Sequence, residues 1–157
     1  MKRIYAPWRI EYIECCDKQD GCFLCNPEKD NLIIFQNELV EVVMNKYPYN
    51  PGHLLVAPRR HVGDVVELKD QEYAEMFRLS QLCVKTLRNS MNPEGFNLGI
   101  NVGRTAGAGL EGHVHLHVVP RWNGDTNFMP VFDDVRVIPE SMQKTHAKLK
   151  EEFMKLV

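Results

Sequence analysis

The chain has 157 residues, 44% of them hydrophobic and 25% charged, a balance that supports a single globular domain with a buried core. Its formal net charge of −2, with both signs mixed, argues against a protein that coats nucleic acid or binds a membrane surface through basic residues. No apolar run reaches the roughly 18 residues of a membrane-spanning helix, and the charged start MKRIYAPWRIEYIE lacks the apolar core of a signal peptide. We therefore expect one domain over 1–157, located in the cytoplasm.

The cysteine pattern does not fit a secreted disulfide framework. The five cysteines are an odd number, Cys15 and Cys16 are adjacent, and Cys22 and Cys25 form a C-x-x-C pair. A metal site or a redox pair fits this pattern better. The segment 1–30, rich in cysteine, proline and charge, is predicted to be irregular.

The segments after residue 30 predict strands first. The runs LIIF (32–35) and LVEVVM (39–44) flank a short polar turn, which predicts a hairpin. After the turn-rich stretch YPYNPG, the run HLLVAP (53–58) predicts a third strand that ends at Pro58.

A long helix is predicted next. Asp70 is a suitable N-cap, apolar residues then recur at spacings of three and four, and the stretch NPEG (92–95) ends the pattern. A strand at 96–102, a glycine loop at 103–112 and a strand at 113–119 follow.

A C-terminal helix is predicted over 139–157, with Pro139 in its first turn. His146 lies in this segment and is expected on the surface. The order of strands, helix, strands and helix predicts an α+β domain with a mostly antiparallel sheet.

The stretch GHVHLHVVPRW (112–122) places three of the six histidines at a spacing of two. On a strand, alternate side chains share a face, so the apolar residues between the histidines face the core and the histidines face the other side. The histidines are His113, His115 and His117, and the apolar residues are Val114, Leu116 and Val118. Three interpretations remain open: a polar surface, a metal site, and an imidazole nucleophile that attacks phosphorus while its neighbours bind the phosphate.

The glycine loop before these histidines indicates an anion site. Its exposed backbone N–H groups and Arg104 are suited to surround phosphate oxygens, although glycine loops also form plain turns. Arg59, Arg60 and Arg121 are expected to add local positive charge.

These motifs carry a family resemblance. HVHLHVV and the stretch NKYPYNPGHLLVAPRRH (45–61) resemble the histidine-triad superfamily of nucleotidyl hydrolases and transferases, from about Cys22 to Trp122. The stretches APWR and PRWNGDTNFMPV are most similar to the bacterial branch that resembles diadenosine tetraphosphate phosphorylases. The resemblance implies an antiparallel α+β fold, a homodimer and a small-molecule nucleotide substrate.

The resemblance also implies roles for individual residues. His115 matches the nucleophile that attacks the α-phosphorus to form a covalent nucleotidyl-histidine, and His117 and His53 match histidines that orient it or contact the phosphate. Asn45 matches a residue that binds the ribose, and Asn101 matches a polar position opposite the phosphate. Arg104, Gly109 and His117 complete the expected nucleotide contacts.

A zinc site follows from the same resemblance. Cys22, Cys25, His61 and His113 match four ligands that would form a closed, structural tetrahedral site. A redox pair and two unrelated thiols remain the alternatives.

The chain departs from the family pattern before the triad. Many members carry Gln and then Ser or Thr where Gly109 and Leu110 stand, and this puts assistance to the leaving group in doubt. Cleavage of a diadenosine polyphosphate is the expected reaction. A purine nucleoside phosphoramidase, a nucleotide-binding module with weak or no catalysis and a zinc-dependent hydrolase remain open.

Overall fold

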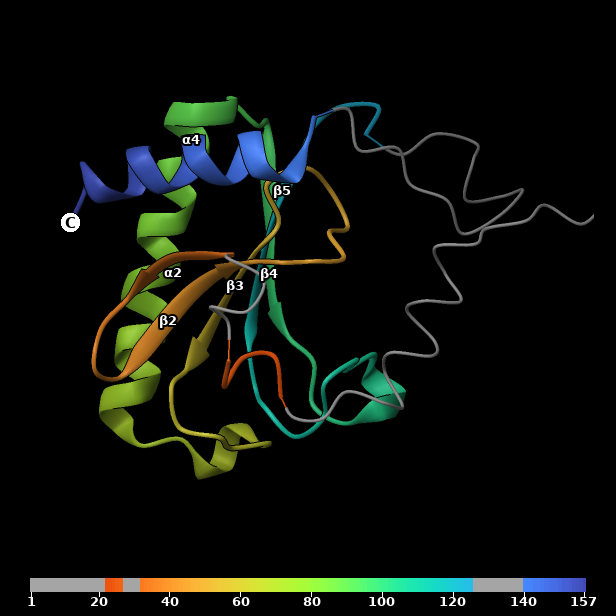
Figure 1. Cartoon of the computed structure of the whole chain (residues 1–157). Helices are drawn as coiled ribbons and strands as arrows, with labels where there is room; N and C mark the ends of the chain where they lie inside the picture. Colours follow the sequence, from red (N-terminus) through yellow and green to blue (C-terminus); the bar gives the residue numbers. More distant parts are fainter. Residues whose placement is uncertain (1–21, 27–31, 126–139) are drawn as a thin grey trace, which may run out of the picture.

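The computed structural model describes residues 22–26, 32–125 and 140–157, in which one five-stranded sheet packs against two α-helices (Figure 1). The strands are β1 (Ile33–Gln36), β2 (Val40–Met44), β3 (Leu54–Pro58), β4 (Gly95–Ile100) and β5 (Leu116–Arg121). They lie in the order β1-β2-β3-β5-β4, and each neighbouring pair is antiparallel. The α+β prediction with an antiparallel sheet is confirmed. Residues 22–26 form turns without regular structure, and the rest of the segment predicted as irregular lies outside the described residues.

The predicted hairpin is present as β1 and β2, with its turn at residues 37–39. The Asn37 side-chain oxygen accepts hydrogen bonds from the backbone N–H groups of Leu39 and Val40, both at 2.9 Å. A short polar side chain that bonds the backbone two and three residues ahead reverses the chain. This contact fixes the position of the turn.

Helix α2 (Asp70–Met91) confirms the long helix, with one difference at its start. Asp70 is the first helical residue and not the cap, because Glu72 accepts a hydrogen bond from the Lys69 backbone N–H at 2.9 Å and so completes the first turn. The helix ends at Asn92, whose φ of 49° is left-handed, and the following proline lacks the N–H needed to continue it.

Helix α4 (Met142–Met154) begins later than predicted, and Pro139 lies outside the described residues. Ser141 caps the helix by accepting a hydrogen bond from the Lys144 backbone N–H. His146 is partly buried and not a surface residue, because its ring bonds the backbone oxygen of Ile33 at 2.8 Å. Helix α4 lies across α2 (Figure 1), and no helix in the described residues is long and apolar enough to cross a membrane.

The two faces of the sheet bury different clusters. The main core, between the sheet and the helices, is built by Ile34, Val40, Val42, Met44, Leu54, Val56, Met76, Leu79, Leu82, Cys83, Leu87, Leu116, Val118, Leu149 and Phe153. The opposite face carries a smaller cluster of Leu24, Val43, Leu55 and Ala57. Because side chains alternate along a strand, Leu116 and Val118 face the core, and His117, paired with Leu55, faces the other side. The side of the sheet away from the helices is therefore the face that carries His117.

Strand β5 begins at Leu116, three residues later than predicted, so His113 and His115 precede it. The antiparallel register would place Val114 opposite Pro58, the last residue of β3. Pro58 has no N–H to donate, and the ladder cannot continue there. The Val114 N–H instead donates to the Val62 carbonyl at 2.7 Å.

Glu41 on β2 is a buried carboxyl group with an incomplete set of partners. Its side chain is 2% exposed, and one of its oxygens, Oε1, has no hydrogen-bond partner among the described residues. Burial raises the pKa of Glu41 from its ordinary value of 4.5 to about 7, and the charge of Arg59 offsets this only in part. Between about pH 4.5 and about pH 7, the folded protein therefore holds a proton at Glu41 that the unfolded chain releases.

We expect Glu41→Gln to stabilise the protein more at pH 8 than at pH 5. The wild-type protein loses stability as the pH rises from about 4.5 to about 7, because ionised Glu41 is tolerated better in the unfolded chain. The variant avoids this loss, and its free energy of unfolding relative to wild type should rise by on the order of 2 kcal/mol between the two pH values. Urea denaturation measures the difference, and equal differences at both pH values would contradict it. Glu38→Gln, in the exposed turn nearby, is the matched control.

Candidate functional site

The imidazole of His115 is held in one tautomer by the backbone of His113, two residues earlier in the chain. Its Nδ1–H donates to the carbonyl oxygen of His113 at 2.7 Å. A carbonyl can only accept, so the proton is on Nδ1 and the lone pair is on Nε2. Nε2 has no hydrogen bond to any described residue, and burial lowers the pKa of His115, which keeps the ring neutral. The result is a buried neutral imidazole with an available lone pair.

A second set of hydrogen bonds fixes the tautomers of His53 and His117. The backbone N–H of Tyr49 donates to His53 Nδ1 at 3.1 Å, so the His53 proton lies on Nε2. His53 Nε2 is 2.9 Å from His117 Nδ1 and donates to it. The proton of neutral His117 therefore lies on Nε2, and the tautomer of His117 is set by a backbone group four residues before His53.

His117 Nε2 is buried and has no hydrogen-bond partner in the described part of the chain. Burial lowers the pKa of His117 to about 4, and repulsion from the protonated form of His115 is the second cause, so the His117 ring is neutral near pH 7. The rings of His115 and His117 lie edge to face with centroids 4.8 Å apart. Two neighbouring rings thus offer a lone pair on one and an N–H donor on the other. This combination suits a group that carries both an electrophilic centre and acceptor oxygens.

Four side chains next to the histidines form a candidate metal site. The ligand atoms of Cys22, Cys25, His61 and His113 all lie within 4.8 Å of one another. The Cys22 and Cys25 sulfurs are 3.1 Å and 3.6 Å from His113 Nδ1, and the Cys25 sulfur is 3.2 Å from His61 Nδ1. Sulfur and nitrogen ligands of one tetrahedral zinc ion lie about 3.6 Å apart, so the cluster is close to the spacing that zinc requires.

His113 is oriented for this role by a carbonyl group. Its Nε2–H donates to the Pro58 carbonyl oxygen at 2.7 Å, which leaves the lone pair on Nδ1, the atom that faces the two cysteines. The ring is fully buried, and its edge meets the His61 ring. The sequence-predicted ligands are therefore brought together with their donor atoms inward.

Asn45 and Asn101, which are predicted to contact the nucleotide, form hydrogen bonds within the protein. Both ends of the Asn45 amide are used within its loop, because its oxygen accepts from the Tyr47 N–H at 3.0 Å and its nitrogen lies 3.2 Å from His53 Nδ1. The Asn101 side chain donates to the Gly107 carbonyl at 3.3 Å and ties down the glycine loop. The ribose and phosphate roles of these residues stay predictions.

The glycine loop is exposed at Arg104 and Gly109, as a phosphate-binding loop requires. Leu110, at a position where the family resemblance implies Ser or Thr, packs against the apolar cluster of Leu24, Val43, Leu55 and Ala57. This position contributes packing and no polar group.

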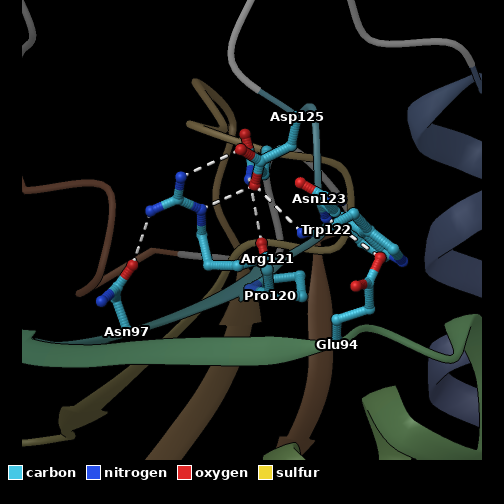
Figure 2. Close-up of polar contacts among 8 residues, drawn as sticks. Glu94, Asn97, Pro120, Arg121, Trp122, Asn123 and Asp125 are labelled. Atoms are coloured by element: carbon cyan, nitrogen blue, oxygen red, sulfur yellow. Dashed lines mark hydrogen bonds and ion pairs between the residues drawn. The ribbon is translucent and has the colours of Figure 1, made fainter.

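Two of the arginines expected to add positive charge are neutralised. Arg60 forms a two-pronged ion pair with Glu72, with distances of 2.9 Å and 2.8 Å. Arg121 pairs with Asp125 in the same way (Figure 2). The local positive charge expected at Arg60 and Arg121 is therefore offset, because each guanidinium is matched by a carboxylate.

Sequence reasoning missed Tyr49, Asn50 and Asp125. The Tyr49 ring stacks on His117, with centroids 5.6 Å apart and an interplanar angle of 17°, and also contacts His53. Asn50 donates to Asp125 across 75 positions of sequence. The stretch YPYNPG indicated only a turn, and its two tyrosines before PGH are the signal that could have drawn attention to it.

Comparison with known proteins identifies the family. Residues 26–124 match the family model described as "HIT domain", and the chain belongs to the HIT family. The predicted membership is confirmed. That residues 1–157 form one domain stays a prediction.

Three relatives are informative. The chain is 36% identical over 165 residues to a protein of Mycobacterium tuberculosis named AP-4-A phosphorylase, covering 98% of this chain and 85% of that one. It is 35% identical over 89 residues to bis(5'-adenosyl)-triphosphatase of Dictyostelium discoideum, covering 57% of this chain and 59% of the relative. The crystal structure of a zinc-bound histidine triad family protein from Mycobacterium smegmatis superimposes with a TM-score of 0.71 at 28% identity, covering 87% and 95% of the two chains.

We expect Cys25→Ser to lower metal content and thermal stability together. The substitution removes one of the four ligands, and a metal that binds only the folded state stabilises it by mass action. Metal content is measured by atomic emission, and the Tm by calorimetry before and after chelation. Cys83→Ala is the control, because this buried thiol lies in the helix core. It should lower the Tm and leave the metal content unchanged, and a Cys25→Ser protein with full metal content would contradict the site.

Proposed function

We propose that this protein transfers a nucleotidyl group from a dinucleoside polyphosphate, of the diadenosine type, through a covalent intermediate on His115. The observation that carries the proposal is the tautomer of His115, whose backbone hydrogen bond leaves Nε2 as the free nucleophilic atom. Membership of the HIT family and similarity to the AP-4-A phosphorylase supply the substrate class.

In the first step, the Nε2 lone pair of His115 attacks the α-phosphorus and a new N–P bond forms. The bond from phosphorus to the bridging oxygen breaks, and the leaving polyphosphate takes the electron pair. His115 becomes positively charged, and the His113 carbonyl at 2.7 Å from Nδ1 stabilises that charge. In the second step, an oxygen of water or of inorganic phosphate attacks phosphorus, and the N–P bond electrons return to Nε2. When water is the acceptor, the proton that it loses passes to the solvent.

His117 is assigned to the phosphate group. Its Nε2–H is a buried donor with no partner in the described residues, and such a donor is costly unless a ligand satisfies it. A non-bridging oxygen of the α-phosphate would accept from it while the phosphorus faces His115. His53 is wholly buried and reaches His117, so its proposed role is to orient His117.

The metal proposed for Cys22, Cys25, His61 and His113 is zinc. Two thiolates and two imidazoles complete a tetrahedral shell, in which zinc acts as a structural cross-link. The ligands would hold residues 22–26 beside the triad. His113 would connect the metal site to the nucleophile, because its side chain is a ligand and its backbone carbonyl accepts a hydrogen bond from His115. The proposed assembly is a homodimer, and a cytoplasmic location stays a prediction from the sequence.

The principal alternative is a nucleotide-binding module with weak or no catalysis. Leu110 favours it, because this side chain packs in an apolar cluster and supplies no proton to a leaving group. A purine nucleoside phosphoramidase would share the same intermediate and would differ in its preferred substrate.

Product analysis tests the reaction. Purified protein is incubated with diadenosine tetraphosphate, with and without inorganic phosphate, and the nucleotides are separated. ADP and ATP that appear only with phosphate would establish a phosphorylase, whereas AMP and ATP without phosphate would establish water as the acceptor. Unchanged substrate would contradict the dinucleotide proposal.

We expect His115→Ala to lower turnover by about 10³-fold or more and to keep nucleotide binding, because only the nucleophile is lost. Turnover is followed by product analysis, and binding by calorimetry with a non-cleavable analogue. Intact mass at alkaline pH should show a nucleotidyl adduct on the wild-type protein and none on the variant. His146→Gln removes a histidine outside the site and is the control. Retained turnover in His115→Ala would refute the nucleophile.

A further inference from the structure

The carboxylate of Asp125 lies at the centre of a hydrogen-bond network beyond the triad (Figure 2). Its Oδ2 accepts from Arg121 Nε at 2.6 Å, from Asn50 Nδ2 at 2.7 Å and from the Trp122 N–H at 3.1 Å. Its Oδ1 accepts from Arg121 Nη2 at 2.9 Å. The side chain is 9% exposed, so these bonds are largely shielded from water. Asp125 thus gathers donors from two separate parts of the chain.

Asn50 is the donor that comes from far away in the sequence. It lies in the loop between β2 and β3, and its side chain donates both to Asp125 and to the Pro120 carbonyl of β5, the latter at 2.9 Å. Its own carbonyl accepts from the His53 N–H at 3.1 Å. The Asn50 side chain therefore fastens the loop to the strand that carries His117.

The fastened loop carries the groups that set the tautomer of His117. Tyr49, the residue before Asn50, donates its N–H to His53 Nδ1 and stacks its ring on His117. The Asn45 amide nitrogen, in the same loop, is the second donor to His53 Nδ1, at 3.2 Å. The bond between His53, the residue before β3, and His117 on β5 is 2.9 Å long. A displacement of the loop would lengthen the Tyr49–His53 bond that directs it. Polar networks of this kind act as a unit, because each bond orients the next.

We propose that Asp125 is a positioning residue: through Asn50 it holds the β2–β3 loop on β5, so that the Tyr49 N–H keeps His53, and hence His117, in a single tautomer. The consequence for the reaction rests on the proposed function. The consequence for the tautomers does not, because they can be observed without substrate.

The test compares three truncations in the full-length, metal-loaded protein. Asn50→Ala removes the link and keeps the Arg121–Asp125 ion pair, and Asp125→Ala removes the centre of the network. Glu94→Ala is the matched control, because Glu94 accepts from the Asn123 N–H in the same network and has no bond to Asn50 (Figure 2). Thermal melting establishes whether each variant is folded. If Asp125→Ala does not fold, Asn50→Ala alone decides the outcome.

Long-range ¹H–¹⁵N spectra of the histidine rings report the tautomers. In the wild type and in Glu94→Ala, His53 and His117 should each show a single Nε2–H form. In Asn50→Ala and Asp125→Ala, both should show mixed forms, whereas His115 should keep its Nδ1–H form, because its partner is the backbone of His113. With diadenosine tetraphosphate, kcat should fall about tenfold or more while KM changes little.

The proposal is overturned if Asn50→Ala keeps single tautomers at His53 and His117, or if Glu94→Ala disturbs them equally. A wild-type protein that fails to cleave the substrate but shows the expected ring signals would overturn the proposed function alone.

Discussion

The hydrogen bond from His113 Nε2–H to the Pro58 carbonyl is the contact on which the site depends. It turns Nδ1 toward Cys22 and Cys25, and the backbone carbonyl of the same residue accepts a hydrogen bond from His115 Nδ1–H. One residue therefore belongs to the candidate metal cluster through its side chain and fixes the candidate nucleophile through its backbone. Pro58 is suited to this position, because a residue without an N–H ends the ladder and leaves its carbonyl free for a side chain.

The two histidines at the centre of the site are neutral. His115 and His117 are buried and have lowered pKa values, and their protons are placed by hydrogen bonds and not by charges. In a poorly solvated environment, such bonds are stronger than in water, and each fixes the direction of the next. The arginines expected to supply positive charge are partly occupied elsewhere, as the ion pairs of Arg60 and Arg121 show. Backbone carbonyl and N–H groups thus do the orienting that charged side chains do in other sites.

The fold and the centre of the site could be predicted from the sequence because both depend on local spacing. Alternation in HVHLHVV and the C-x-x-C pair are short patterns with few interpretations, and helical periodicity located α2. The boundaries were missed where a single contact decides them, such as Glu72 accepting the Lys69 N–H at the start of α2. Asn50 and Asp125 were missed because each is one polar residue in a turn, and their partnership spans 75 positions. No periodicity or motif in the sequence predicts such a contact, because it depends on how the strands pair in three dimensions.

The register between β3 and β5 makes the segment 113–121 sensitive to the insertion or deletion of a residue. His117 faces the site because it stands opposite Leu55, while Val118 stands opposite Leu54 and enters the core. A shift of one residue would bring an apolar side chain to the face of the candidate site and bury an imidazole against the helices. Many substitutions in this segment would preserve its alternation, but an insertion or deletion of one residue would not. An insertion or deletion of one residue within 113–121 is therefore expected to damage the site and the core together, whereas an exchange of side chains that keeps the alternation affects only one of them.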